Sequence, residues 1–120
     1  MQIETQLSDQ IARYLDLATS EAKLTAANMA NIDTPGYRAL GMDFEAEMRE
    51  AMTDLKAGRA ARPARIKEVD GLIARPDGNN VSMDREGLNL AEAQLRFRTG
   101  VALLRQENQR VLDAIHADSK

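Results

Sequence analysis

Apolar side chains recur at steps of three and four residues along the first part of the chain, which is the spacing of one face of an amphipathic helix. We expect this helix to run from near Glu4 to Asn31, a length of about 40 Å. The stripe narrows to alanine in its second half, where a neighbouring helix can approach closely. Its members are Leu7, Ile11, Leu15, Ala18, Ala22, Ala26 and Met29.

A second stripe, near the C-terminus, follows a heptad repeat sustained over more than three repeats, which is typical of a helix that packs along another helix. Ser82 or Asp84 is suited to cap its start, and Glu86 suits the positive end of the helix dipole. Two amides in the seam weaken it but can fix register and partner choice. One series of seam positions is Leu90, Phe97, Leu104 and Val111, and the alternate series is Gln94, Val101, Asn108 and Ile115.

The segment between these two helices is uneven. Residues 58–65 form a basic stretch with no apolar side chain larger than alanine or proline, which we interpret as a mobile loop. Pro76-Asp77-Gly78-Asn79 lies between residues 72–74 and 80–83, and Asp-Gly favours the primed turns of a β-hairpin. Helical spacing predicts a short third helix through Phe44, Met48, Ala51, Met52 and Leu55. The expected fold class is mainly α, with two long helices forming a helical hairpin or coiled-coil-like pair, a short third helix and a small irregular or β-hairpin middle segment.

Composition supports packing of helix on helix. The chain of 120 residues has no cysteine and no tryptophan, and only two tyrosines and two phenylalanines, so its packing depends mainly on aliphatic side chains. This length is one domain at most. The absence of cysteine excludes a disulfide framework and a thiolate metal site. The first seven residues have neither a basic region nor a continuous apolar region, so we expect no cleaved signal peptide and no membrane insertion.

Motifs for metal binding are weak. Asp77-Gly78-Asn79 invites comparison with a calcium loop, but Val81 takes the fifth loop position and Ser82 replaces the required glycine. Leu88 stands where a bidentate glutamate is needed. The single histidine, His116, has no second candidate ligand near it in the sequence, and it fits a solvent-facing helix end better than a metal site. We therefore expect no metal and no cofactor.

Signals for catalysis and nucleic-acid binding are also weak. No serine nucleophile has a plausible base, and pairs such as Glu45 with Arg49 fit surface support of a helix, so we expect no enzyme. The net charge is -3, and the basic run has neither aromatic stacking residues nor a recognition motif beside it, so we expect no nucleic-acid partner. A solvated loop explains the run better. It consists of Arg59, Arg62, Arg65 and Lys67.

The most informative segment ends the first helix. Asn28 and Asn31 lie on one helix face. Pro35 pushes Thr34 out of the helical region, and Gly36 supplies the positive φ that a type II turn needs after a proline. A simple helix stop explains Pro-Gly alone. For Asn28 and Asn31, we expect hydrogen bonds to the backbone of the turn, with surface-exposed capping as the alternative.

The whole string at residues 28–39, Asn-Met-Ala-Asn-Ile-Asp-Thr-Pro-Gly-Tyr-Arg-Ala, closely resembles the signature of the flagellar rod and hook family of axial proteins. Met42-Asp43-Phe44 follows at the distance that the family leads us to expect. Asp77-Gly78-Asn79-Asn80-Val81 resembles the element before the C-terminal helix. Ala93 and Phe97 depart from the family pattern, which has asparagine and tyrosine there.

This resemblance implies a structural subunit of the proximal rod of the bacterial flagellar basal body that polymerises through its terminal helices and transmits torque. It also implies a periplasmic location after export by the flagellar type III system without a signal peptide. The implied partners are further copies of the chain, other rod subunits and the small adaptor that joins the rod to the membrane ring. We expect residues 1–34 and 84–120 to form a helical assembly domain and residues 35–83 to form a middle segment.

Two sets of residues follow from these expectations. The signature of the turn is Asn28, Asn31, Thr34, Pro35, Gly36 and Tyr37. The expected assembly interface is Leu7, Ile11, Leu15, Ala18, Ala22, Met29, Leu90, Phe97, Val101, Leu104, Val111 and Ile115.

An alternative function is a self-contained helical adaptor or export chaperone that binds one client helix in a groove. An adaptor is expected to be a folded unit of fixed stoichiometry. A rod subunit is expected to be partly unfolded alone and to become ordered on assembly.

Overall fold

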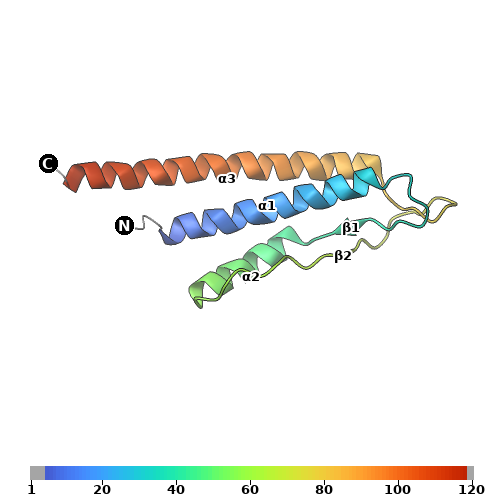
Figure 1. The fold of residues 1–120 in the computed structure, drawn as a ribbon, viewed down its shortest axis with the longest axis horizontal. Helices are drawn as coiled ribbons and strands as arrows, with labels where there is room; N and C mark the ends of the chain where they lie inside the picture. Colours follow the sequence, from blue (N-terminus) through green and yellow to red (C-terminus); the bar gives the residue numbers. More distant parts are fainter. Residues whose placement is uncertain (1–4, 119–120) are drawn as a thin grey trace.

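The computed structural model describes residues 5–118, and in this part of the chain three helices lie side by side along the long axis of the molecule (Figure 1). The molecule measures 70 × 27 × 19 Å, so it is itself rod-shaped. The helices are α1 (Gln6–Ala30), α2 (Phe44–Lys56) and α3 (Met83–Asp118), and the two short strands are β1 (Leu40–Gly41) and β2 (Lys67–Glu68). The predicted fold class is confirmed.

Side-chain caps set the start of each helix. The Thr5 hydroxyl accepts from the Ser8 amide at 3.0 Å and the Ser8 hydroxyl accepts from the Thr5 amide at 2.9 Å, which is a capping box for α1. The expected start near Glu4 lies outside the described residues. Asp43 caps α2. Ser82, rather than Asp84, caps α3, because its hydroxyl accepts from the Arg85 amide.

The central helix is α1, with α3 running antiparallel along one side and α2 along another (Figure 1). Among the described residues the fully buried apolar side chains are few, and half of them are alanines. They are Ile11, Leu17, Ala18, Ala39, Val81 and Ala93. The core is therefore a thin seam between helices and not a globular interior.

The contact of α3 with α1 uses a different alternate series from the predicted one. The buried residues of α3 are Glu86, Ala93, Gly100 and Glu107, spaced one heptad apart. They lie four residues before the predicted series that starts at Leu90. Of the predicted alternates, Gln94, Asn108 and Ile115 are exposed and Val101 is half-buried. The series through Ala93 and Gly100 faces α1 for a steric reason, because alanine and glycine let α1 approach more closely than valine or isoleucine can.

The predicted hairpin around Asp77-Gly78 is wrong. Residues 72–74 and 80–82 form no strands, and the two-stranded sheet instead pairs β1 with β2, with Leu40 opposite Glu68. The turn itself does form, because the Gly78 amide donates to the Arg75 carbonyl at 2.8 Å. After the turn, the Asn79 amide donates to Asp77 Oδ1, the Asn80 amide to the Tyr37 carbonyl and the Val81 amide to Asn79 Oδ1, so no partner strand is needed.

Candidate assembly site

Asn28, in the last turn of α1, is buried and binds the chain that returns after the turn. Its Nδ2 donates to the Leu40 carbonyl at 2.8 Å, and its Oδ1 accepts from the Leu40 amide at 3.0 Å. The Tyr37 hydroxyl donates to the same Oδ1 at 3.1 Å. The side chain of Asn28 thus joins β1 to the end of α1 as a neighbouring strand would.

Asn31 behaves differently from Asn28. Its Nδ2 donates to the Ala27 carbonyl of its own helix at 2.8 Å, and its Oδ1 accepts from the Thr34 hydroxyl at 3.0 Å. Both contacts are exposed, and they match the capping alternative. Its backbone carbonyl has a further role, since it accepts from Asn79.

Two asparagines that sequence reasoning placed only in a turn motif complete this network. Asn79 is buried, and its Nδ2 donates to the carbonyls of Asn31 and Thr34, both at 2.8 Å. The Oδ1 of Asn80 accepts from the Ala39 amide at 2.6 Å. Polar residues beside Asp-Gly were the available signal, but a local turn explained them equally well. We call Asn28, Asn31, Asn79 and Asn80 the asparagine junction.

The turn that contains Gly36 and the turn that contains Gly78 meet at the asparagine junction. Gly36 has a φ of +74° and follows the exposed Pro35, and the Tyr37 amide donates to the Thr34 carbonyl at 3.2 Å, which is the turn that the sequence predicts. The Gly36 amide donates to the Asp77 carbonyl at 2.8 Å. A Cβ at Gly78 would lie 3.4 Å from Gly36 Cα, so the two turns touch through their backbones.

The residues predicted for the assembly interface divide by burial. On α1, Ile11 and Ala18 are buried within the chain and Leu7 is exposed. On α3, Phe97 and Ile115 are exposed. The half-buried members are Leu15, Ala22, Met29, Leu90, Val101, Leu104 and Val111. Much of the predicted set therefore packs α1 against α3 inside one chain.

Close approach of α1 and α3 depends on Gly100. A Cβ at this position would lie 2.5 Å from Leu15 Cδ2 and 3.1 Å from Tyr14 Cδ1, closer than van der Waals contact allows. Ala93, one heptad earlier, is also buried. Small residues in the seam therefore set the separation of the two helices.

Arg96 of α3 links all three helices. Its Nη1 lies 2.7 Å from both carboxylate oxygens of Glu21 in α1, and its guanidinium carbon lies 4.1 Å from the ring centre of Phe44 in α2. Tyr14 meets Phe44 edge to face at 5.4 Å. Burial raises the pKa of the Glu21 carboxyl, and the neighbouring Arg96 partly offsets this shift.

Glu107 ties the start of α1 to α3. The Thr5 hydroxyl donates to its Oε1 at 2.8 Å, and Arg110 Nη2 donates to the same oxygen at 2.8 Å. Hydrogen bonds from Arg110 and then Thr5 lower the pKa of Glu107. A buried acid in a heptad seam is thus satisfied by a cap residue and a neighbouring arginine.

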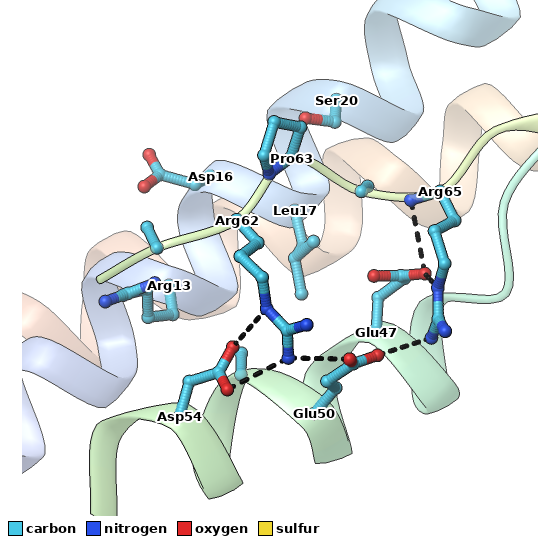
Figure 2. Close-up of a pocket in the computed structure, with 13 residues that line it drawn as sticks. Arg13, Asp16, Leu17, Ser20, Glu47, Glu50, Asp54, Arg62, Pro63 and Arg65 are labelled. Carbon is cyan, nitrogen blue, oxygen red and sulfur yellow. Dashed lines mark hydrogen bonds and ion pairs between the residues drawn. The ribbon is translucent and has the colours of Figure 1, made fainter. Parts of the chain in front are cut away.

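The basic segment after α2 is tied to that helix by charge, an arrangement that its lack of large apolar side chains did not indicate. Figure 2 shows Arg62 and Arg65 reaching the acids of α2, and bonds from Arg62 and Arg59 lower the pKa of Asp54. A cleft of about 380 Å³ lies beneath the segment, with Leu17 of α1 in its wall. The pairs of this arginine ladder are Arg59 with Asp54, Arg62 with Asp54 and Glu50, and Arg65 with Glu47 and Glu50.

Large exposed apolar side chains gather on α3. Leu88 is 69% exposed and Leu95 is 66% exposed, and both lie within α3. Exposed apolar surface of this kind marks a protein interface. The full set in the described residues is Leu7, Ile66, Ile73, Met83, Leu88, Leu95, Phe97, Leu103, Leu112 and Ile115.

The described residues carry neither a metal-binding cluster nor a membrane-spanning helix. Residues 5–118 hold no group of three or more His, Cys, Asp or Glu side chains arranged to bind a metal ion. No helix within the same range is both long and apolar enough to cross a membrane. His116 is exposed on the last turn of α3.

The fold thus defines an elongated helical subunit in which the apolar outer surface of α3 is suited to binding other helices. Among known proteins, the chain is 32% identical over 108 residues to the flagellar basal body rod protein FlgB of Yersinia ruckeri, covering 75% of this chain and 79% of the relative. It is 32% identical over 117 residues to FlgB of Cereibacter sphaeroides, covering 89% and 91%. For FlgB of Salmonella typhimurium the identity is 32% over 112 residues, covering 75% and 78%.

No family model matches the chain. The identity to these relatives and the share of each chain that it covers nevertheless show that the chain belongs to the FlgB family of flagellar basal body rod proteins. The resemblance found in residues 28–39 is therefore confirmed.

Proposed function

We propose that this chain is a structural subunit of the proximal rod that polymerises through its terminal helices and transmits torque along the basal body. Membership of the FlgB family, together with the exposed apolar side chains along α3, carries this proposal. In it, residues 1–34 and 84–120 form the assembly domain, and residues 35–83 form a middle segment that braces α1.

The ties between α1 and α3 support a load-bearing role. Thr5 bonds Glu107 near one end of the pair, and Glu21 bonds Arg96 in the middle. The asparagine junction closes the other end. Sliding of one helix along the other would break all three ties together, so the pair resists shear as a unit.

The proposed location rests on the name of the relatives, which are flagellar basal body rod proteins. We assign this chain the same place, with export through the flagellar type III system. Its proposed partners are further copies of the chain, the other rod subunits and the small adaptor between the rod and the membrane ring. The outer faces of α1 and α3 are the surfaces available to them.

Substitution of Phe97 by aspartate tests assembly through α3. The Phe97 ring is 46% exposed and lies one heptad from Leu90 and Leu104, so a neighbouring helix can cover it. An unpaired charge in a covered apolar contact costs several kcal/mol, on the order of 3–5. In a strain that lacks the native copy, Phe97→Asp is expected to abolish incorporation into purified basal bodies while the isolated chain keeps its circular dichroism spectrum.

Thr53→Asp is the matched control, because it adds the same charge at an exposed position of α2, away from α3. It is expected to incorporate normally. If Phe97→Asp also incorporates normally, α3 is not an assembly surface. If Phe97→Asp unfolds a stable monomer, the ring belongs to an internal core, and the adaptor or chaperone alternative is favoured.

A further inference from the structure

The face of α3 that points away from α1 has a heptad pattern of its own. Buried contacts with α1 recur at Ala93 and Gly100, and positions two residues later lie about 200° around the helix, on the opposite side. All residues of this second face are exposed. It combines leucines with two arginines. Its members are Leu88, Ala91, Leu95, Arg98, Ala102, Arg105, Gln109 and Leu112.

The free face of α1 has the same spacing but the opposite character. Its side chains are small or acidic except for one lysine, and Asp16 at its edge also lines the cleft beneath the basic segment. All are exposed except Thr19, which is half-buried. Its members are Asp9, Ala12, Asp16, Thr19, Lys23, Ala26 and Ala30.

Charges on these two faces are complementary. Asp9 and Asp16 are one heptad apart on α1, and Arg98 and Arg105 are one heptad apart on α3. Within residues 5–118 none of these four side chains forms an ion pair, although the nearby Arg96 and Arg110 do. Two free acids and two free arginines at equal spacing can pair across a helix contact, where they fix orientation and register.

The register of the chain's own helix pair indicates which residues would meet. Leu15 lies beside Gly100, and Thr5 bonds Glu107. In the same antiparallel register, Asp16 is level with Arg98, and Asp9 is level with Arg105. The large side chains of α3 are then level with small ones of α1, namely Leu95 with Thr19 and Leu88 with Ala26, while Ala102 is level with Ala12.

We propose that the outer face of α3 in one copy docks on the free face of α1 in a second copy, antiparallel and in the register of the intramolecular pair. This contact rests on the proposed function, since it gives the surfaces by which copies of the chain would assemble. Asp16 pairs with Arg98 and Asp9 pairs with Arg105 across the contact, while Leu88 and Leu95 fill the space that small residues leave.

This contact joins two different surfaces, so it is heterologous and continues from copy to copy. Because α3 and α2 already pack on two sides of α1, the free face is the remaining part of its surface and is not diametrically opposite α3. A third copy therefore docks at an angle to the first two, and a row of copies curves. Curvature of this kind produces a ring or a helical tube.

Engineered disulfides test the contact directly, because the native chain has no cysteine. Two differently tagged copies, one with Ala12→Cys and one with Ala102→Cys, are produced together in a flagellated strain that lacks the native copy. Both substitutions are small and leave the four charges in place. Mild oxidation of purified basal bodies is expected to give a disulfide dimer that carries both tags, since Cβ atoms of facing residues lie within bonding range.

Two control pairs define what the dimer means. Ala12→Cys paired with Ala60→Cys places the second thiol on the exposed basic segment and is expected to give no mixed dimer. Ala12→Cys present in both copies tests a two-fold contact in which α1 meets α1. A dimer from that pair, or equal dimer yields from all pairs, would overturn the proposed contact.

Charge reversal tests the register independently. Asp16→Arg alone and Arg98→Asp alone are each expected to abolish swimming, and the two substitutions together in every copy are expected to restore it. Arg49→Asp, at an exposed position of α2 without an ion pair among the described residues, is the matched control and is expected to swim. Restoration would fail if the two residues do not face each other.

The outcomes separate the two proposals. If the chain is present in basal bodies but gives no mixed dimer and both reversed variants swim, this contact is wrong while the rod function stands. If the native chain is absent from basal bodies, the proposed function itself fails.

Discussion

At the scale of single residues, the asparagine junction shows how a side chain can replace secondary structure. Asn28 satisfies both backbone groups of Leu40, and Asn79 satisfies two carbonyls at the end of α1. Backbone groups left without partners in a buried setting cost about 1–3 kcal/mol each. Buried asparagines are thus required here for geometry, although residues of this type are usually exposed.

Asn28 and Asn31 form a matched pair for a test of this account. Asn28→Ala leaves the amide and carbonyl of Leu40 without their partner in a buried site, and we expect a loss of about 2–4 kcal/mol in the free energy of unfolding. Asn31→Ala removes exposed contacts, and we expect a loss of less than about 1 kcal/mol. Urea titration followed by helical circular dichroism, with a stabilising osmolyte throughout, measures both values. Equal losses would contradict the structure.

Gly36 allows a second test at this scale, because its φ of +74° is costly for residues with a branched Cβ. Space is not the constraint, since a Cβ at Gly36 would meet no atom within 4 Å. Gly36→Val is expected to disrupt assembly and swimming in a complementation assay. Gly36→Asn is expected to retain both, because asparagine tolerates this conformation. Normal swimming of the valine variant would show that assembly does not depend on the conformation of this turn.

At the scale of elements, the α1–α3 seam depends on small residues at its centre. A Cβ at Gly100 would collide with the side chain of Leu15, and overpacking of this kind costs about 1–3 kcal/mol. We expect Gly100→Val to lower the free energy of unfolding by about that amount, and we expect Leu15→Ala in the same chain to recover part of the loss. A double-mutant cycle on urea midpoints measures the coupling. Strictly additive losses would show that the two side chains do not meet.

Both long helices and α2 could be predicted from the sequence because each has a sustained apolar period. The side of α3 that faces α1 could not be predicted, because the series through Leu90 and Leu104 can combine with either of two neighbouring series to form a heptad seam. The apolar pattern favours the one with Val101 and Ile115. The chain uses the one with Gly100 and Glu107, whose acid is satisfied by Thr5, a contact between residues far apart in the sequence.

The middle segment was harder to predict for a similar reason. Strands of two residues carry no periodic signal, and β1 meets β2 only because the chain between them is placed by α2. The arginine ladder joins three basic residues to acids of the preceding helix. Each arginine is more than half exposed, so solvent screens these ion pairs and each contributes little to stability. Such pairs position a segment more than they stabilise the fold.

At the scale of the whole molecule, many large apolar side chains lie on the surface and few are buried. The fully buried apolar side chains among the described residues form a thin seam, while Leu88, Leu95 and Phe97 are exposed along α3. We expect a chain built in this way to gain stability when a second molecule covers the outer face. The elongated shape and the ties between α1 and α3 suit a subunit that works inside a larger assembly.

The protein composition of purified basal bodies shows whether the chain is built into the rod. Basal bodies from cells producing the native chain are isolated and their proteins are quantified by mass spectrometry. We predict that the chain is present in proportion to other rod proteins. Recovery of the chain only from the cytoplasm, with basal bodies complete without it, would contradict the account.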